Sequence, residues 1–569
     1  MYELVIRGGN LVDGSGSPLR VCDVAVDAGS ITAVGDHLGP GRREIDAAGL
    51  LVTPGFVDVH THYDAQASWD PYLTPSSWHG VTTAVMGNCG VGFAPAAPDR
   101  HEWLIELMEG VEDIPGAALT EGIDWGWETF PEYLDVLDRR EYVIDIGTQV
   151  PHGAVRAYVM GERGAANEPA RADDIAAMAA LVAEGLTAGA LGFSTSRTPL
   201  HTSKSGQLVP GTMVDADELI GIAEAMTSVG HGVFQFAPEH VILLDQEWAW
   251  MRALAQRTGR TVSVNFSQTD QQPDLWRDVI VKLDEARADG IPIVAQVHGR
   301  TVGLLMCLEG SYHPLMFHPA YQEIAALPLA GRCDVLRRGP IRDRIINDVP
   351  DDGGFFRSAV LMALRKTWAV ADGDIDYEPD LSDSIGNLAE RADTPAMELV
   401  IDHLLSADGH GMLYSPFFNY SYGDLSFVYE AHLNPSTRMG LADAGAHCGV
   451  ICDGGTPTFM LTHWTRDRTR GPRLPLEYVV HRQTRQTAEL YGLCDRGLLA
   501  PGMRADINVI DYQRLTFGSA RMAWDLPGDA PRLVQRASGY RHTFVAGVET
   551  VTNDEFTEAL PGRLIRGPR

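Results

Sequence analysis

Two histidines one residue apart, His60 and His62, close a short apolar run at residues 54–59. Side chains at positions i and i+2 of a β-strand lie on one face, so both imidazoles can bind the same metal ion. A pair of surface histidines would show the same spacing. The run is bounded by Pro-Gly before it and by polar residues after it, which favours a buried strand that carries metal ligands at its end.

The elements that position this pair alternate between strands and helices through the middle of the chain. This alternation is typical of an α/β fold with a parallel (β/α)8 TIM-like barrel. Helices are expected between the strands, for example at 172–188 and 216–229. The eight predicted strands are 56–59, 82–86, 143–147, 190–193, 233–236, 262–266, 291–297 and 439–443.

Both chain ends show short alternating segments separated by turn residues, which is the pattern of β structure. We therefore expect a small β-sandwich domain built from residues 1–52 and 502–569, and a catalytic barrel at 53–501. The interval 299–437 is too long for one strand-to-helix connection of a barrel. It is expected to hold a helical insertion that covers the barrel mouth.

The 569-residue chain has 45 basic and 76 acidic residues, giving a net charge of −31. This charge argues against nucleic acid and membrane surfaces as partners and leaves a small-molecule substrate. The N-terminal residues lack the pattern of a signal peptide, and no apolar run is long enough to cross a membrane. The seven cysteines are odd in number and scattered, so a cytoplasmic protein with free thiols is expected. The sequence is compatible with a homo-oligomer.

Four further segments carry a resemblance to a known family. They are GVTTAVMGNCGVGFAP at 80–95, PHGAVRAYVMG at 151–161, GALGFSTS at 189–196 and DRGLLAPGMRADI at 495–507. With the histidine strand and the flanking β segments, they make the chain resemble the amidohydrolase superfamily, and within it the N-acyl-D-amino-acid deacylases (D-aminoacylases). The Gly-Asn-Cys-Gly turn is the specific motif, and the likeness spans nearly the whole chain.

The resemblance implies a metal-dependent barrel with a named ligand set. His60 and His62 would bind metal, Cys89 would be a thiolate ligand after strand 2, and Asp443 would be both ligand and general base. These donors suit Zn²⁺, which lowers the pKa of a bound water to about 7, and a carboxylate can pass the water's proton to the leaving nitrogen. A buried core thiol at Cys89 and a helix-capping role for Asp443 are the alternatives.

The chain departs from the family pattern on strands 5 and 6. Gln235 and Asn265 stand where the family has two more histidine ligands, and neutral amides are poor zinc ligands. Ser267 replaces the basic residue expected to hold a substrate carboxylate. We therefore expect at most one tightly bound zinc per chain. If the alignment is shifted by a residue or two, His240 or His298 enters the site instead.

Other polar residues follow predicted barrel strands and could contact substrate. His152 follows strand 3, Arg197 follows strand 4, and Arg300 follows strand 7. Each could equally be an ordinary loop residue in contact with solvent. The candidate substrate-binding residues are His152, Arg197, Gln235, Asn265, His298 and Arg300.

The predicted function is hydrolysis of a C–N amide bond by a zinc-dependent amidohydrolase. By resemblance, the substrate is an N-acyl amino acid, and in particular an N-acyl-D-amino acid. A cyclic amide or lactone hydrolase of the same superfamily is one alternative. Another is a non-catalytic binding protein with a degenerate metal site, which the amides at Gln235 and Asn265 motivate.

Overall fold

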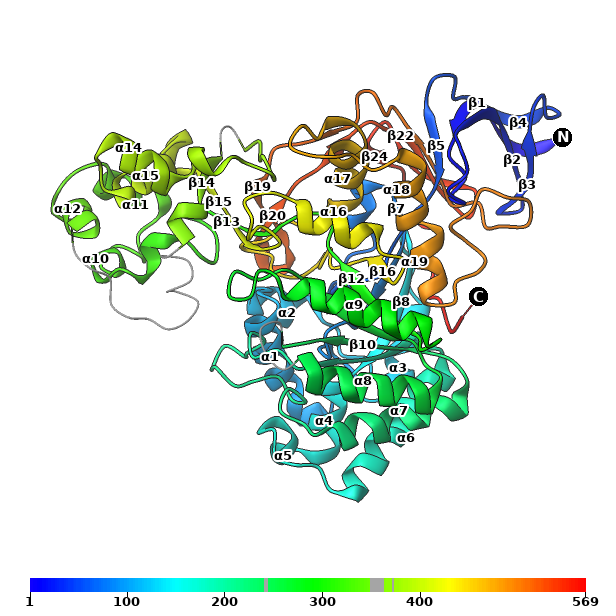
Figure 1. Ribbon diagram of the computed structural model, residues 1–569, viewed down its shortest axis with the longest axis horizontal. Coiled ribbons are helices and arrows are strands. Elements are labelled where there is room, and N and C mark those ends of the chain that lie inside the picture. The colour runs from blue at the N-terminus through cyan, green and yellow to red at the C-terminus, as the bar shows by residue number, and fades with distance from the viewer. Residues whose placement is uncertain (240–243, 348–362, 371–372, 569) are drawn as a thin grey trace.

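The computed structural model describes residues 1–239, 244–347, 363–370 and 373–568 (Figure 1). Its centre is an eight-stranded parallel sheet in the order β16-β12-β11-β10-β9-β8-β7-β6. Each of the eight predicted strands overlaps one of these strands, so the predicted α/β barrel is confirmed. The strands are β6 (Phe56–Asp58), β7 (Val81–Met86), β8 (Asp145–Pro151), β9 (Gly192–Ser196), β10 (Val233–Ala237), β11 (Val262–Phe266), β12 (Ile293–Val297) and β16 (Thr437–Met439).

The two outer strands of this sheet, β6 and β16, are joined just beyond their ends. The His62 N–H donates to the Ala444 carbonyl oxygen at 2.8 Å, and the Asp443 N–H donates to the His60 carbonyl oxygen at 3.1 Å. These bonds curl the sheet into a barrel. They also hold the candidate ligands of the first strand against those of the last.

Strands β7 to β11 are buried along their whole length, as expected for a parallel sheet covered on both faces. Helices α6 (Ala172–Ala188) and α7 (Ala216–Val229) end at the residues predicted from the sequence. Next to them in Figure 1 lie α8 (Leu244–Thr258) and α9 (Leu275–Ala288). The rings of Phe236 on β10 and Trp250 on α8 lie 5.0 Å apart, so aromatic packing joins the helix layer to the barrel.

A second, nine-stranded sheet is built from both ends of the chain. Its N-terminal part pairs with its C-terminal part where β5 runs antiparallel to β17. Its own apolar core includes Leu4, Ile6, Val24 and Phe544. The borders 1–52 with 502–569 stay a prediction. The strands are β1 (Tyr2–Leu11), β2 (Arg20–Asp27), β3 (Ser30–Gly35), β4 (Gly41–Asp46), β5 (Leu51–Pro54), β17 (Ile507–Ile510), β22 (Tyr540–Val545), β23 (Val548–Thr552) and β24 (Glu555–Phe556).

The described elements from β13 to β15 form a lobe at the left of Figure 1, with an apolar core of its own, whereas α16 (Ser426–Leu433) packs against the barrel. Helices were expected there, but the lobe also contains an antiparallel sheet in the order β13-β15-β14, which the sequence analysis missed. Short apolar runs do not reveal by periodicity whether they are strands or helices. The elements are β13 (Val302–Met306), α10 (Pro319–Gln322), α11 (Leu329–Arg337), α12 (Pro340–Asn347), β14 (Trp368–Val370), α14 (Ile385–Ala392), α15 (Ala396–Leu404) and β15 (Met412–Phe418).

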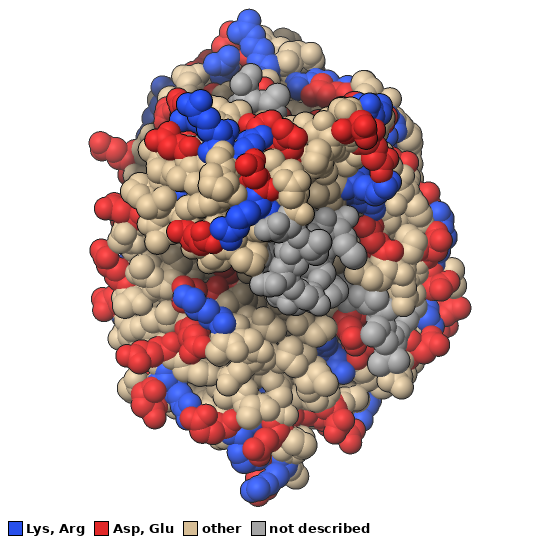
Figure 2. Space-filling model, turned by 90° about the vertical axis from the view of Figure 1, so that its left-hand side faces the viewer, with Lys and Arg blue, Asp and Glu red and all other residues tan. Residues whose placement is uncertain are grey.

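The face that this lobe presents carries acidic and basic side chains interspersed with neutral ones, as Figure 2 shows. Over the part of the chain that the structure describes, no helix is both long enough and apolar enough to span a membrane.

Candidate metal centre

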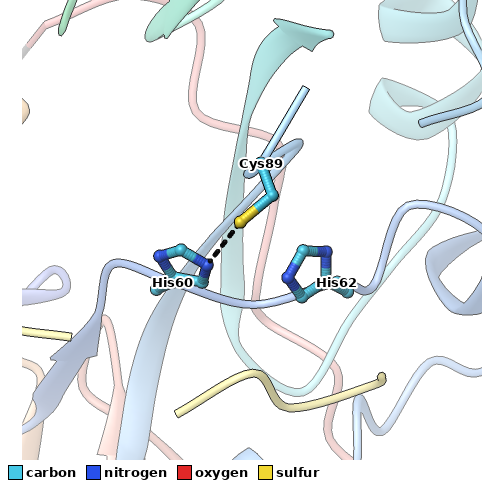
Figure 3. Close-up of side chains that lie close together, drawn as sticks. All are labelled: His60, His62 and Cys89. Atoms are coloured by element: carbon cyan, nitrogen blue, oxygen red, sulfur yellow. Dashed lines mark hydrogen bonds between the residues drawn. The ribbon is translucent and has the colours of Figure 1, made fainter. Parts of the chain in front are cut away.

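Three buried side chains converge at the carboxyl ends of β6 and β7 (Figure 3). They are His60, His62 and Cys89, and one ligand atom from each lies within 4.8 Å of the others. His60 Nε2 is 3.3 Å from Cys89 Sγ. The structure therefore brings together the three metal ligands that the sequence predicted from two different strands.

The turn after β7 aims the cysteine at the histidines. Cys89 has a φ of +56°, a left-handed conformation that is uncommon for a residue with a β-carbon. The Asn88 side-chain amide stabilises this turn by donating to the carbonyl oxygens of Thr61 at 3.1 Å and Val85 at 3.0 Å. Gly90, also at positive φ, comes so close to the backbone of Thr195 that a β-carbon there would lie 2.7 Å from its Cα. The Gly-Asn-Cys-Gly sequence thus gives the sharp turn that the thiol position requires.

Asp443 closes the cluster from the end of β16. Its Oδ1 lies 3.1 Å from His60 Nε2 and 3.5 Å from His62 Nε2. Its side chain is 21 % exposed, whereas the side chains of His60 and His62 are at most 2 % exposed. Asp443 is therefore the member of the cluster that faces solvent.

Gln296, on β12, fixes the ring of His60. Its Oε1 lies 2.7 Å from His60 Nδ1, and its amide nitrogen donates to Ser263 Oγ at 2.9 Å. An amide oxygen only accepts, so Nδ1 of His60 carries a hydrogen and Nε2 is the nitrogen that faces the cluster. The sequence analysis missed Gln296, although a polar residue inside an apolar strand was a usable signal.

Glu112 faces the other histidine. Its Oε1 lies 3.3 Å from His62 Nδ1, and both side chains are only 2 % exposed. Glu112 follows helix α1 (His101–Val111), in the long connection after β7. The sequence analysis also missed this residue, because no local pattern connects a helix end to a histidine on another element.

The two amides on β10 and β11 form hydrogen bonds with the cysteine. Gln235 accepts the Cys89 N–H through Oε1 at 2.8 Å and donates to Asn265 Oδ1 at 2.8 Å. Asn265 in turn donates to Cys89 Sγ at 3.4 Å. Both residues thus lie against Cys89 on the strands where histidine ligands were expected, and their polar groups are used within the protein.

Opposite charges shift the pKa values of the cluster. Burial lowers the pKa of His60, but the neighbouring Cys89 and Asp443 outweigh burial and raise it to about 10. Burial raises the pKa of the Cys89 thiol, but the two histidines, His60 above all, lower it below its ordinary value. Burial also opposes ionisation of Asp443, yet the same histidines hold its pKa well below its usual range. The cluster favours a thiolate and a carboxylate, which are the ionisation states that bind metal, and a metal ion that binds there displaces the proton of His60.

The donor set fits a zinc ion. Ligand atoms of a tetrahedral zinc site lie roughly 3.3–3.6 Å apart, given zinc–nitrogen and zinc–oxygen bonds near 2.1 Å and zinc–sulfur bonds near 2.3 Å. The separations of His60 Nε2 from Cys89 Sγ and Asp443 Oδ1 are 3.3 and 3.1 Å, and His62 Nε2 lies 3.5 Å from Asp443 Oδ1. Imidazole and thiolate donors also favour zinc over the hard cations.

Comparison with known proteins decides the family. The model of the family described as "Amidohydrolase family" matches residues 43–551. The chain belongs to this family. The predicted resemblance to the amidohydrolase superfamily is thereby confirmed.

Two relatives of this amidohydrolase match it over almost their whole length. A D-aminoacylase of Alcaligenes xylosoxydans xylosoxydans is 26 % identical over 575 residues, which cover 99 % of this chain and 97 % of that protein. An N-acyl-D-glutamate deacylase of the same organism is 25 % identical over 570 residues, which cover 99 % of this chain and 96 % of that protein.

Solved structures share the fold of this amidohydrolase. A crystal structure of a D-aminoacylase has a TM-score of 0.66 and 23 % identity, and the match covers 100 % of both chains. The N-acyl-D-glutamate deacylase of Bordetella bronchiseptica, complexed with zinc and a phosphonate inhibitor, has a TM-score of 0.65 and 22 % identity over 100 % of both chains.

Two predicted substrate-binding residues, His152 and Arg197, form hydrogen bonds with other side chains of the protein. Both ring nitrogens of the fully buried His152 have partners, Thr195 Oγ1 at 2.8 Å and Glu218 Oε1 at 3.0 Å. The Nε atom of Arg197 donates to both carboxylate oxygens of Glu247 at 2.8 Å. These contacts favour structural roles for the two residues over contact with substrate.

His298 and Arg300, which follow β12, are also fully buried. His298 Nδ1 accepts the Arg300 N–H at 3.1 Å, and its Nε2 lies 3.1 Å from Thr456 Oγ1, so both nitrogens have partners within the protein. Arg300 donates to Asp453 Oδ1 at 2.9 Å, and its guanidinium carbon lies 3.5 Å from the Tyr377 ring centre. The alternative ligand His240 lies outside the described residues.

Proposed function

We propose that this amidohydrolase is a zinc-dependent deacylase that hydrolyses the amide bond of N-acyl amino acids, with N-acyl-D-amino acids as the substrate class. The observation that carries the proposal is the cluster of His60, His62 and Cys89 closed on its solvent side by Asp443. The names of the full-length relatives, a D-aminoacylase and an N-acyl-D-glutamate deacylase, support the substrate class.

Within the cluster, His60, His62 and Cys89 would bind the metal, and Asp443 would transfer the proton. A zinc ion held there would act as a Lewis acid, favouring the ionisation of water and polarising the substrate carbonyl. Gln296 keeps His60 in the tautomer that binds through Nε2. Asp443, the exposed member, accepts a proton from the attacking water and returns it to the leaving nitrogen. Its contact with both histidines holds it beside the scissile bond.

One zinc per chain is part of the proposal. A second ion beside Cys89 would need further strong ligands from β10 and β11, and these strands offer the neutral amides of Gln235 and Asn265. The two amides form hydrogen bonds with each other and with Cys89. This supports the proposal that protein groups fill the position that a second metal ion would occupy. A D-aminoacylase structure reported with a binuclear metal centre and "one-metal activation" is that of another protein. It is 22 % identical to this chain.

The test is a hydrolysis screen of the zinc-loaded protein against N-acetyl-D- and N-acetyl-L-amino acids, with hydantoins and lactones beside them. We expect turnover of N-acetyl-D-amino acids that is lost after chelation and regained with zinc. The variant Asp443→Asn should keep its zinc and lose at least about a hundredfold in kcat. The exposed Asp289→Asn is the control. Unchanged turnover in Asp443→Asn contradicts the proposed role.

The alternatives drawn from the sequence have less support. A non-catalytic binding protein would not need the solvent-facing carboxylate beside two buried imidazoles. Hydrolysis of hydantoins or lactones alone would favour the ring-opening alternative. We also propose a cytoplasmic location, which the seven free cysteines support.

A further inference from the structure

A mostly apolar pocket lies where the ends of β10 and β11 meet helices α8 and α9. Its cavity volume is about 70 Å³, and part of the pocket is open to solvent. The helices lie beside β10 in Figure 1. The apolar lining includes Phe236, Trp248, Met251, Val264, Trp276 and Val279.

Asn265 connects this pocket to the metal cluster. It lines the pocket, and its side-chain amide donates to Cys89 Sγ at 3.4 Å. Cys89 Sγ is itself 3.3 Å from His60 Nε2. One side chain therefore separates the pocket from the donor atoms, which places the pocket next to the metal cluster.

The charges around the pocket select which part of the substrate enters. Glu239 and Glu247 line it, and no lysine or arginine does so among the residues that the structure describes. Arg197 lies nearby but donates to both oxygens of Glu247. A free carboxylate would meet like charge there, which is unfavourable. The amino-acid half of the substrate carries its carboxylate and its side chain on the same carbon, whereas the acyl half carries no charge.

We propose that this pocket binds the acyl chain of the substrate, and that the preferred substrates are N-acyl amino acids whose apolar acyl chain is several carbons longer than acetyl. This inference rests on the proposed function. The amide carbonyl lies at the metal cluster, the amino-acid half stays at the barrel mouth, and the acyl chain passes Asn265 to lie between α8 and α9.

A chain-length series on the unmodified protein tests the inference. The N-acetyl, N-butanoyl, N-hexanoyl and N-octanoyl derivatives of one amino acid are compared by kcat/KM. We expect kcat/KM to rise roughly threefold to fourfold for each methylene that enters the pocket, which is the usual gain for burying that group. A series that is flat, or that falls from acetyl onward, overturns the inference while leaving the deacylase function standing.

Two valines on helix α9 give a matched pair of variants. Val279 lines the pocket, whereas Val281 is 56 % exposed and does not. Val279→Phe should fill the space and reduce the ratio of octanoyl to acetyl kcat/KM at least tenfold. Val281→Phe makes the same substitution on the solvent side and should keep the ratio. Circular dichroism checks that both variants fold, and equal ratios in both variants overturn the inference.

A binding measurement tests the apolar pocket independently of catalysis. Octanamide and acetamide are both uncharged, so calorimetric titration compares the pocket's affinity for an apolar chain without requiring turnover. We expect octanamide to bind at least tenfold more tightly than acetamide, and Val279→Phe to remove the difference. If this holds in a protein that deacylates nothing, the proposed function fails and the apolar site stands. Equal binding of the two amides overturns the inference.

Discussion

Nδ1 of His62 lies 3.3 Å from Oε1 of Glu112, and Nε2 of the same ring lies 3.5 Å from Oδ1 of Asp443. The two carboxylates thus face opposite edges of one imidazole. Glu112 is buried and comes from the connection after β7, so it can hold the ring without reaching the metal side. The contact is one of opposite charge, and a carboxylate beside a metal-binding histidine makes it a stronger ligand.

Neutralising Glu112 should weaken zinc binding. In Glu112→Gln the carboxylate charge behind His62 is lost, and we expect zinc affinity to fall roughly tenfold or more. Competition with a chromophoric chelator measures this directly. Glu109→Gln is the matched control, because Glu109 lies on the same helix and pairs with the exposed Lys204. Equal affinities in the two variants would show that Glu112 only fills space.

Gln296 should matter through the hydrogen bond it accepts from His60. Replacing it with leucine removes the acceptor 2.7 Å from Nδ1, and zinc affinity should fall about tenfold because the tautomer is no longer fixed. Gln296→Glu keeps an acceptor oxygen at that position and should restore most of the affinity. If the leucine and glutamate variants bind zinc equally, the orientation of His60 does not depend on this contact.

Elemental analysis should find one zinc per chain in the unmodified protein. The position beside Cys89 is surrounded by the amides of Gln235 and Asn265 instead of imidazoles. Introducing Gln235→His and Asn265→His together should raise the content toward two, because strong zinc ligands then come from β10 and β11. Either substitution alone should have little effect. Two zinc ions per chain in the unmodified protein would contradict the one-metal site.

Acid should destabilise the protein through Glu378. Burial raises the pKa of this carboxyl, but hydrogen bonds from His463 and Arg468 outweigh burial and lower it to about 2. A folded-state pKa below the unfolded value of about 4.5 stabilises the protein above that pH, by up to about 3 kcal/mol. This stabilisation is lost as the pH falls from 4.5 toward 2.

Denaturant unfolding of Glu378→Gln checks this pH dependence. The variant should be less stable than the unmodified protein at pH 6, because Arg468 is then buried beside a neutral group. The difference in unfolding free energy should shrink as the pH falls below 4.5. A difference that stays constant from pH 6 to pH 3 would contradict the assignment.

Several features of the fold and of the metal cluster could be predicted from residues that are close together in the chain. The period of two along a strand places His60 and His62 on one face, and Gly residues allow the turn that carries Cys89. Apolar periodicity gave α6 and α7 with their observed ends and located all eight barrel strands. These features depend on residues close together in the chain, so the sequence by itself determined them.

Tertiary structure decided which distant residues complete the site. Asp443 meets His60 because β6 and β16 close the barrel, while Glu112 and Gln296 approach the two histidines from other elements. The apolar pocket beside Asn265 likewise depends on how α8 and α9 pack on the sheet. Asp443 and Gln296 can be noticed in the sequence, but which histidine each side chain contacts depends on packing and burial across the whole fold.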